Sequence, residues 1–175
     1  MSLAHLASLE PTTTTERALA FFDGLPAVRA DEILGRWKGR ELATGHPMDG
    51  VLAASGWYGK QFDSVEKVHP LLVAAGGSLF PMEPRRVPLK LVAGLPRSLV
   101  AKGRPLIGVL EPWLRASKHR ARLRNLEYRG VVSASMIYDH LPIIDTFRRV
   151  DDDTLLGAMD LRGLRAPYMF VLARD

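Results

Sequence analysis

The stretch GRWKG, residues 35–39, predicts a β-strand that has one apolar and one basic face. Successive side chains of a strand point to opposite faces, so Trp37 shares a face with Gly39, while Arg36 and Lys38 point the other way. Glycine within a strand lets a ring or another backbone approach closely. We therefore interpret Trp37 as facing the interior of a β-structure, where it either closes the wall of a barrel or contacts a ligand.

The composition is that of a globular protein with one core. The chain has 175 residues, of which 47% are hydrophobic and 25% charged. It has no cysteine, which excludes disulfides and thiolate metal or redox sites. Its first 15 residues lack the basic and apolar regions of a signal peptide, and no apolar run approaches the roughly 18 residues that span a bilayer. We therefore expect a cytoplasmic protein.

Positive charge is concentrated in one region. The net charge is +5, yet residues 81–130 carry 12 Lys and Arg against 3 Asp and Glu. Within this region, 97–120 reads as a basic helix with an apolar stripe that includes Trp113. Such a helix suits an anionic membrane surface or a protein partner, although a solvated basic face is an equal alternative. No nucleic-acid-binding signature accompanies it, so we do not expect nucleic acid as a partner.

The N-terminal half shows helix signals around the GRWKG strand. Thr13 and Glu16 have the spacing of a capping box, and Gly24 can end the helix that follows. Asp49 is a candidate N-cap for a second short helix. In the segment VEKVHPLLV (65–73), Pro70 predicts an edge strand or a broken strand.

The remainder of the chain divides into an irregular part and a regular part. Pro105 predicts the start of a helix, and Pro112 predicts a kink in it. From residue 120 onward, five short segments with turns between them predict an antiparallel meander. A meander of this length has to curl or close to bury its apolar face.

Candidate ligand-binding residues are aromatic, sulfur-containing or histidine side chains near these strands. Aromatic rings supply apolar contact area, and a histidine can meet the polar end of a ligand. Ordinary core packing is the competing interpretation for each of them. The candidates are Trp37, His46, Trp57, Tyr58, His69, Met136 and Tyr138.

A catalytic interpretation rests on one group. Asp139, His140 and Asp145 lie close in sequence, and an Asp beside a His can support general-base chemistry. The same residues also suit a plain β-turn. No nucleophile motif or metal-ligand spacing is present, so we assign no catalytic residue, no metal and no cofactor.

Several motifs together resemble the GXWXG-type domain of bacterial and plant proteins. They are GRWKG (35–39), TGHPMDG (44–50), GWYGKQF (56–62) and VHPLL (68–72). Residues 127–160 and 167–175 resemble the domain of unknown function that usually follows it. The resemblance implies a mainly β fold with short helices, as one antiparallel barrel or half-barrel that is lipocalin-like or pleckstrin-homology-like. It implies one structural domain over 1–175, composed of a GXWXG segment (16–75), a basic connection (76–119) and a C-terminal meander (120–175).

The resemblance also implies a function. A lipid-like or other small hydrophobic ligand, such as a fatty acid, is the expected cargo of such a barrel. A weaker similarity to lipocalins places an arginine of the last strand over the tryptophan of the first. Here these residues are Arg174 and Trp37. The alternatives that stay open are a small-molecule enzyme and a membrane-surface or protein-interaction module.

Overall fold

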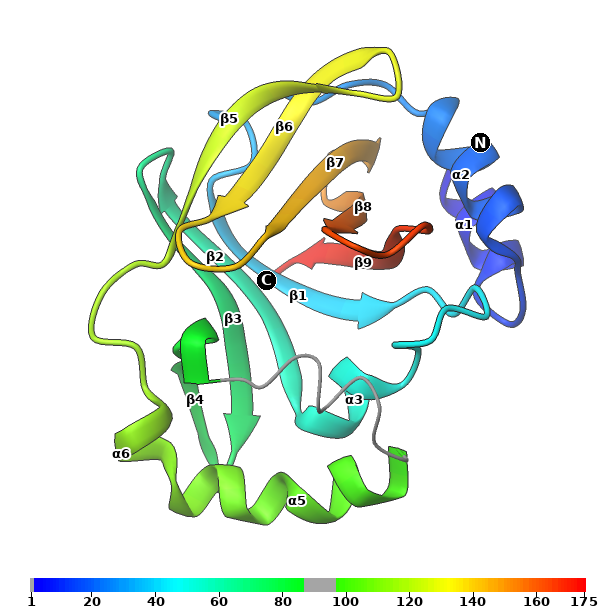
Figure 1. Ribbon diagram of the computed structural model, residues 1–175. Coiled ribbons are helices and arrows are strands. Elements are labelled where there is room, and N and C mark those ends of the chain that lie inside the picture. The colour runs from blue at the N-terminus through cyan, green and yellow to red at the C-terminus, as the bar shows by residue number, and fades with distance from the viewer. Residues whose placement is uncertain (1, 87–96) are drawn as a thin grey trace.

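The computed structural model describes residues 2–86 and 97–175, and its nine strands form one antiparallel sheet (Figure 1). The strands are β1 Gly35–Glu41, β2 Trp57–Ser64, β3 Lys67–Ala75, β4 Ser78–Pro81, β5 Ala121–Tyr128, β6 Val131–Tyr138, β7 Ile143–Asp151, β8 Thr154–Leu161 and β9 Tyr168–Arg174. The helices are α1 Ser2–Leu9, α2 Thr15–Asp23, α3 Val51–Ser55, the 3-10 helix η1 Pro84–Arg86, α5 Arg97–Val109 and α6 Glu111–Leu114.

The sheet closes on itself. Its order is β2-β1-β9-β8-β7-β6-β5-β3, and β3 pairs back onto β2, so that eight strands form a ring. The short β4 pairs with β3 outside this ring. The prediction of a mainly β, barrel-like fold with short helices is thus confirmed, and closure leaves few of the unpaired strand edges that promote aggregation.

Strand β1 has the predicted orientation. Trp37 is fully buried, whereas Arg36 and Lys38 are exposed. The Trp37 indole N–H donates to the carbonyl of Ile33 at 2.8 Å. The Arg174 guanidinium lies 4.3 Å from the Trp37 ring centroid, so the arginine-over-tryptophan contact expected from the lipocalin similarity is present.

The five-strand C-terminal meander is also confirmed, as β5 to β9. One apolar cluster fills the inside of the ring, with Trp37, Phe62, Met136, Phe147 and Phe170 among its members. A second cluster lies between α1 and α2 and the outer side of the sheet, as Figure 1 shows for these helices. The helices α1 and α2 therefore cover part of the outer side of the sheet, and the interior of the ring is a separate core.

Two helix predictions in the N-terminal half need correction. The N-cap of α2 is Thr14, whose hydroxyl accepts from the amide of Arg17, and not Thr13. The N-cap of α3 is Gly50, and not Asp49. The Asp49 carboxylate instead accepts hydrogen bonds from the three amides of residues 44–46, at 2.8–3.0 Å, and so folds the preceding loop.

Proline positions account for further differences. Pro70 does not break β3, because it lies between Val68, where β5 pairs, and Leu72, where β4 begins to pair. A missing N–H is tolerated where the ladder changes partner. Pro105 lies inside α5, which begins at Arg97. The helix does end before Pro112, which occupies the first turn of α6.

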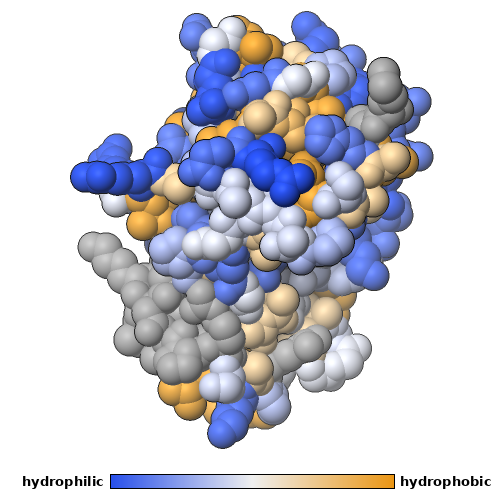
Figure 2. All heavy atoms as spheres, turned by 90° about the vertical axis from the view of Figure 1, so that its right-hand side faces the viewer, coloured by the Kyte–Doolittle hydropathy of each residue, from blue (hydrophilic) through white to orange (hydrophobic). Residues whose placement is uncertain are grey.

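The α5–α6 segment packs against β3 and β4 through Leu114 and Ile107. Other apolar side chains of this segment are exposed, and Figure 2 shows apolar atoms at the surface at the lower end of the molecule, where Figure 1 places α5. Part of the predicted basic connection, 87–96, lies outside the described residues. None of the described helices has the length and hydropathy that a bilayer span requires.

Candidate functional site

A lysine and an aspartate meet inside the barrel. Lys60 of β2 and Asp145 of β7 have side chains that are 3% and 1% exposed, and Lys60 Nζ lies 2.7 Å from Asp145 Oδ2. Three strands separate β2 from β7 in either direction around the ring, so the two strands face each other across the interior. The ion pair therefore crosses the middle of the barrel.

Aromatic rings surround this ion pair. Lys60 Nζ lies 5.0 Å from the ring centroid of Phe170 and 5.7 Å from those of Trp57 and Tyr138. These distances are within the range of cation–π attraction. Nζ also donates to the carbonyl of Pro70 at 3.2 Å. The ammonium group is thus held by one carboxylate, one carbonyl and three ring faces.

Burial governs the protonation of the acidic groups here. It raises the pKa of Asp145, and the attraction of Lys60 opposes this only in part. The pKa of the Tyr138 hydroxyl is raised well above its usual value, first by burial and then by the charge of Asp145. Tyr138 is therefore a neutral hydroxyl at physiological pH, and the Asp145 carboxyl holds a proton more readily than an exposed aspartate does.

Apart from Asp145 Oδ2, which forms the ion pair with Lys60, two polar atoms of these residues have no hydrogen-bond partner among the described residues. They are Asp145 Oδ1, an acceptor, and the indole Nε1 of Trp57, a donor. An unpaired buried polar group costs about 1–3 kcal/mol. A buried ion pair is likewise weak evidence for stability, because desolvation offsets its attraction. The arrangement therefore suits the binding of a molecule that completes these hydrogen bonds.

Four of the predicted ligand-binding residues lie in this interior. Trp37, Trp57, Met136 and Tyr138 belong to the buried cluster that fills the ring. Of these, Trp57 and Tyr138 lie near Lys60, while Trp37 packs against Arg174.

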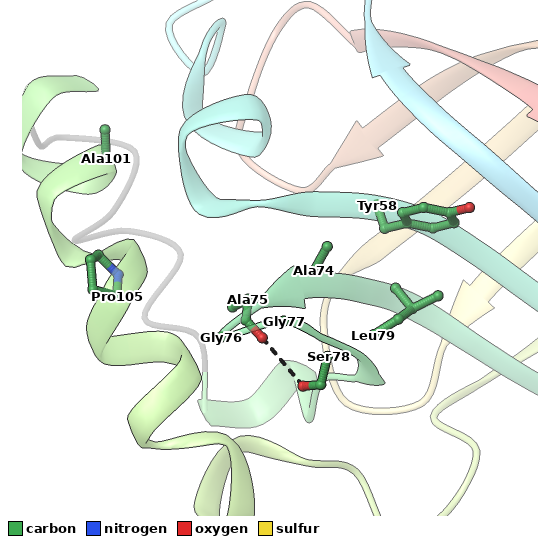
Figure 3. Close-up of a pocket in the computed structure, with 9 residues that line it drawn as sticks. All are labelled: Tyr58, Ala74, Ala75, Gly76, Gly77, Ser78, Leu79, Ala101 and Pro105. Atoms are coloured by element: carbon green, nitrogen blue, oxygen red, sulfur yellow. Dashed lines mark hydrogen bonds between the residues drawn. The ribbon is translucent and has the colours of Figure 1, made fainter.

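Tyr58 points away from the barrel interior. Its hydroxyl donates to the Asp175 carboxylate at 2.8 Å. It lies at one end of a surface pocket between α5 and the β3–β4 turn, whose lining also includes Ala74, Leu79 and Pro105 (Figure 3). The volume of this pocket is about 790 Å³. Tyr58 is thus not part of the site around Lys60.

His46 belongs to a structural loop. Its Nδ1 accepts from the amide of Met48 at 3.1 Å, and its ring lies 5.4 Å from that of Tyr168. Burial lowers the pKa of His46, although Asp49 opposes this. Glu41 binds the Tyr168 hydroxyl and accepts from two amides at the start of α3. The TGHPMDG motif therefore places α3 at one end of the barrel.

His69 lies outside the interior, beside two other polar side chains. Val68 and Phe62 face the core, so His69 and Asp63 point outward from β3 and β2. The His69 ring lies 4.3 Å from that of His119, whose Nε2 is 2.8 Å from Asp63 Oδ2. The two predicted histidines, His46 and His69, therefore do not share a pocket.

The catalytic group predicted from sequence does not converge. Asp139 and His140 are exposed at the β6–β7 turn, whereas Asp145 is buried in β7 against Lys60. Asp139 and His140 lie in the short connection between β6 and β7, where the β-turn interpretation placed them. Of the three residues, only Asp145 lies in an enclosed site.

Lys60 was not among the residues predicted from the sequence, although the sequence contains a signal for it. Lys60 is two residues before Phe62 in β2, so both side chains point to the same face of the strand. Asp145 likewise shares a face with Ile143 and Phe147 in β7. A charged residue in a run of inward positions has to find a buried partner. Period-two alternation could have identified both residues, but only the closed sheet could show that they pair.

Comparisons with other proteins agree with these features. Residues 20–77 match the model described as GXWXG protein, and residues 119–174 match a domain of unknown function (DUF4334). A solved structure described as a protein from Thermomonospora curvata is 35% identical in sequence, with a TM-score of 0.66 over 90% of this chain and 84% of that one. Comparison with curated proteins gave no match. With both segments in the expected order, the chain belongs to the family of GXWXG proteins that carry the DUF4334 domain.

Proposed function

We propose that this protein binds a small, mainly apolar molecule inside its barrel, and that Lys60 and Asp145 contact the polar group of that molecule. The observation that carries the proposal is the buried ion pair with an unpaired Asp145 Oδ1. A hydroxyl group of the ligand would donate to this oxygen. The rings of Trp57, Tyr138 and Phe170 would contact its apolar part.

Flexible side chains in the lining support the proposal. Lys60 has a flexible four-carbon stem, so its ammonium group can move without a backbone change. Met136 and Met159 also line the interior, and methionine side chains adjust to irregular shapes. The expected ligand is therefore lipid-like, with one hydrogen-bond donor.

Ligand binding can be tested with a neutral fluorescent probe, N-phenyl-1-naphthylamine. We expect the probe to bind and to be displaced by dodecanol more strongly than by dodecane. In the double variant Lys60→Met/Asp145→Leu, which removes both charges and keeps apolar volume, the probe should still bind. Displacement by dodecanol should weaken about tenfold, the effect of one lost hydrogen bond of about 1.4 kcal/mol.

The control is Tyr58→Phe, which removes a hydroxyl outside the barrel and should leave dodecanol displacement unchanged. Native mass spectrometry of gently purified protein provides an independent measurement. If the wild type neither binds the probe nor retains a small molecule, the proposal is wrong. Equal displacement from wild type and double variant would exclude Lys60 and Asp145 as the polar contact.

Acid–base catalysis at the same site is a second candidate. Burial raises the pKa of Asp145, which suits a carboxyl group that exchanges protons at a higher pH than an exposed aspartate does. Asp145 would be the acid–base group, with Lys60 stabilising its charged form. A bound molecule whose mass changes on incubation with wild type, but not with Asp145→Asn, would establish turnover; an unchanged mass in both would leave binding alone.

A further inference from the structure

A second cluster of polar side chains lies on the outside of the barrel. One ligand-type atom from each of Asp63, His69 and His119 lies within 4.8 Å of the other two. Atoms bound to one tetrahedral zinc ion lie about 3.4 Å apart, given bonds of about 2.0–2.2 Å. Rotation of the three side chains, without a change in the backbone, would be enough to bring their ligand atoms to the spacing of a zinc site. We propose that Asp63, His69 and His119 form a binding site for a first-row divalent metal ion such as Zn²⁺.

The backbone fixes these residues on neighbouring segments. Asp63 and His69 lie on the paired strands β2 and β3, near the register pair of Gln61 with His69. His119 directly precedes Arg120, whose amide donates to the carbonyl of Val68 at 3.0 Å. The conformation of His69 is further restricted by Pro70, because a residue before proline is held in extended geometry. Strand pairing and the Arg120–Val68 hydrogen bond therefore determine the relative positions of the three residues.

The donor atoms of the cluster favour a metal ion. His69 offers one ring nitrogen to the cluster. Its Nδ1 is buried and has no hydrogen-bond partner among the described residues. Asp63 offers one carboxylate oxygen. The site thus offers one carboxylate and two imidazoles, a donor set typical of zinc and related ions.

A neighbouring side chain already orients one of the three proposed ligands. Gln61 Nε2 donates to Asp63 Oδ1 at 2.7 Å, which orients the carboxylate and leaves Oδ2 toward His119. Such partners fix the orientation of metal ligands. The side chains of Asp63 and His119 are 38% and 32% exposed, so a metal ion held here would keep at least one position open to water.

The position of the site suggests what the metal ion would stabilise. Strands β3 and β5 share a single register pair, Val68 with Ala121. The other pairs of neighbouring strands in the ring each have at least three register pairs. A metal ion bound to His69 and His119 would connect β3 to the residue that leads into β5. It would therefore strengthen the weakest junction of the closed sheet.

The test uses full-length protein without a polyhistidine tag. Titration with Zn²⁺ should give one ion per chain, and Co²⁺ should give the visible absorption of a tetrahedral site. The variants His69→Gln and His119→Gln should each lose at least about tenfold in Zn²⁺ affinity, because each removes one of three ligands. His140→Gln is the matched control, since His140 is exposed at a turn and outside the cluster. Its affinity should equal that of wild type.

Thermal unfolding provides a second measurement of Zn²⁺ binding that is independent of the titration. Zn²⁺ should raise the unfolding temperature of wild type and His140→Gln, and should have little effect on His69→Gln and His119→Gln. Circular dichroism of each variant without metal checks that it folds. Equal Zn²⁺ affinity of wild type and the double variant His69→Gln/His119→Gln would overturn the proposal, as would a wild type that binds no metal.

Discussion

The two glycines of GRWKG have different physical roles. Gly35 has a φ of +113°, a backbone conformation that other residues rarely adopt. Gly39 is required for packing, because a Cβ at this position would lie 2.2 Å from the ring of Trp57. The Trp57 ring therefore occupies the space beside Gly39, and from there it reaches the Lys60 ammonium. The motif shapes the interior as well as supplying Trp37.

We expect Gly39→Ala to destabilise the protein by about 1–3 kcal/mol, the usual cost of overpacking a core. Urea unfolding followed by circular dichroism measures this change. Gly103→Ala is the control, because a Cβ at Gly103 in α5 meets nothing within 4 Å. Alanine there should be neutral or slightly stabilising. Equal stability of Gly39→Ala and wild type would show that Trp57 can move away at no cost.

Among the elements, α5 and α6 have an unusual surface. Five large apolar side chains of this segment are exposed: Leu99, Leu106, Val109, Leu110 and Trp113. The Arg86 guanidinium lies 4.8 Å from the Trp113 ring centroid, and Lys102 and Lys118 are also exposed. Apolar and basic residues on one helical surface are typical of segments that lie on anionic membranes. We propose this role for 97–120.

Vesicle binding can be followed with the intrinsic fluorescence of Trp113. Trp37 and Trp57 are buried, so a blue shift on adding vesicles reports on Trp113, which is 57% exposed. We expect the shift, and co-sedimentation, with phosphatidylglycerol vesicles but not with phosphatidylcholine alone. Trp113→Ser should weaken co-sedimentation several-fold, whereas Val132→Ser, equally exposed on β6, should not. Indifference to lipid charge would exclude this role.

At the scale of the whole molecule, closure of the sheet creates the interior site. Strand β1 pairs with β9, which joins the GXWXG segment to the end of the DUF4334 segment. The same closure brings Lys60 opposite Asp145. Neither segment contains both charged residues, so the candidate site exists only when the two segments complete one ring.

Global stability should fall in mild acid because His46 is buried in its neutral form. Its pKa is lowered in the folded state, so the unfolded chain binds the proton more readily. The stabilisation is full above the ordinary histidine pKa of about 6.5 and is lost as the pH falls through the lower folded value. Asp49 opposes the shift, and Glu41 contacts the neighbouring Tyr168.

The measurement is the urea midpoint at pH 7.5 and pH 5.5 for wild type and His46→Asn. Asparagine can place its oxygen near the position of Nδ1 and accept from the Met48 amide, but it does not titrate. The loss of stability between the two pH values should be smaller in the variant. An identical loss in both proteins would show that other groups cause the pH dependence.

Local sequence patterns were sufficient to predict β1, the orientation of its side chains and the five strands of the C-terminal meander. Period-two alternation placed Trp37 inward and Arg36 outward, and turn residues marked the five segments of the meander. Such local patterns suffice because the side-chain period and the turn chemistry depend on neighbouring residues only. Proline positions predicted the ends of elements less well. Pro70 lies inside β3 and Pro105 inside α5, so neither residue marks the end of its element.

Only the tertiary structure decided which side chains meet. Lys60 and Asp145, and likewise His69 and His119, are far apart in the chain and come together through strand pairing. Conversely, Asp139, His140 and Asp145 are close in sequence but separated by the alternation of side chains and the turn between β6 and β7. The order of strands around the ring depends on non-local contacts, which a local pattern does not contain, and both candidate sites depend on that order.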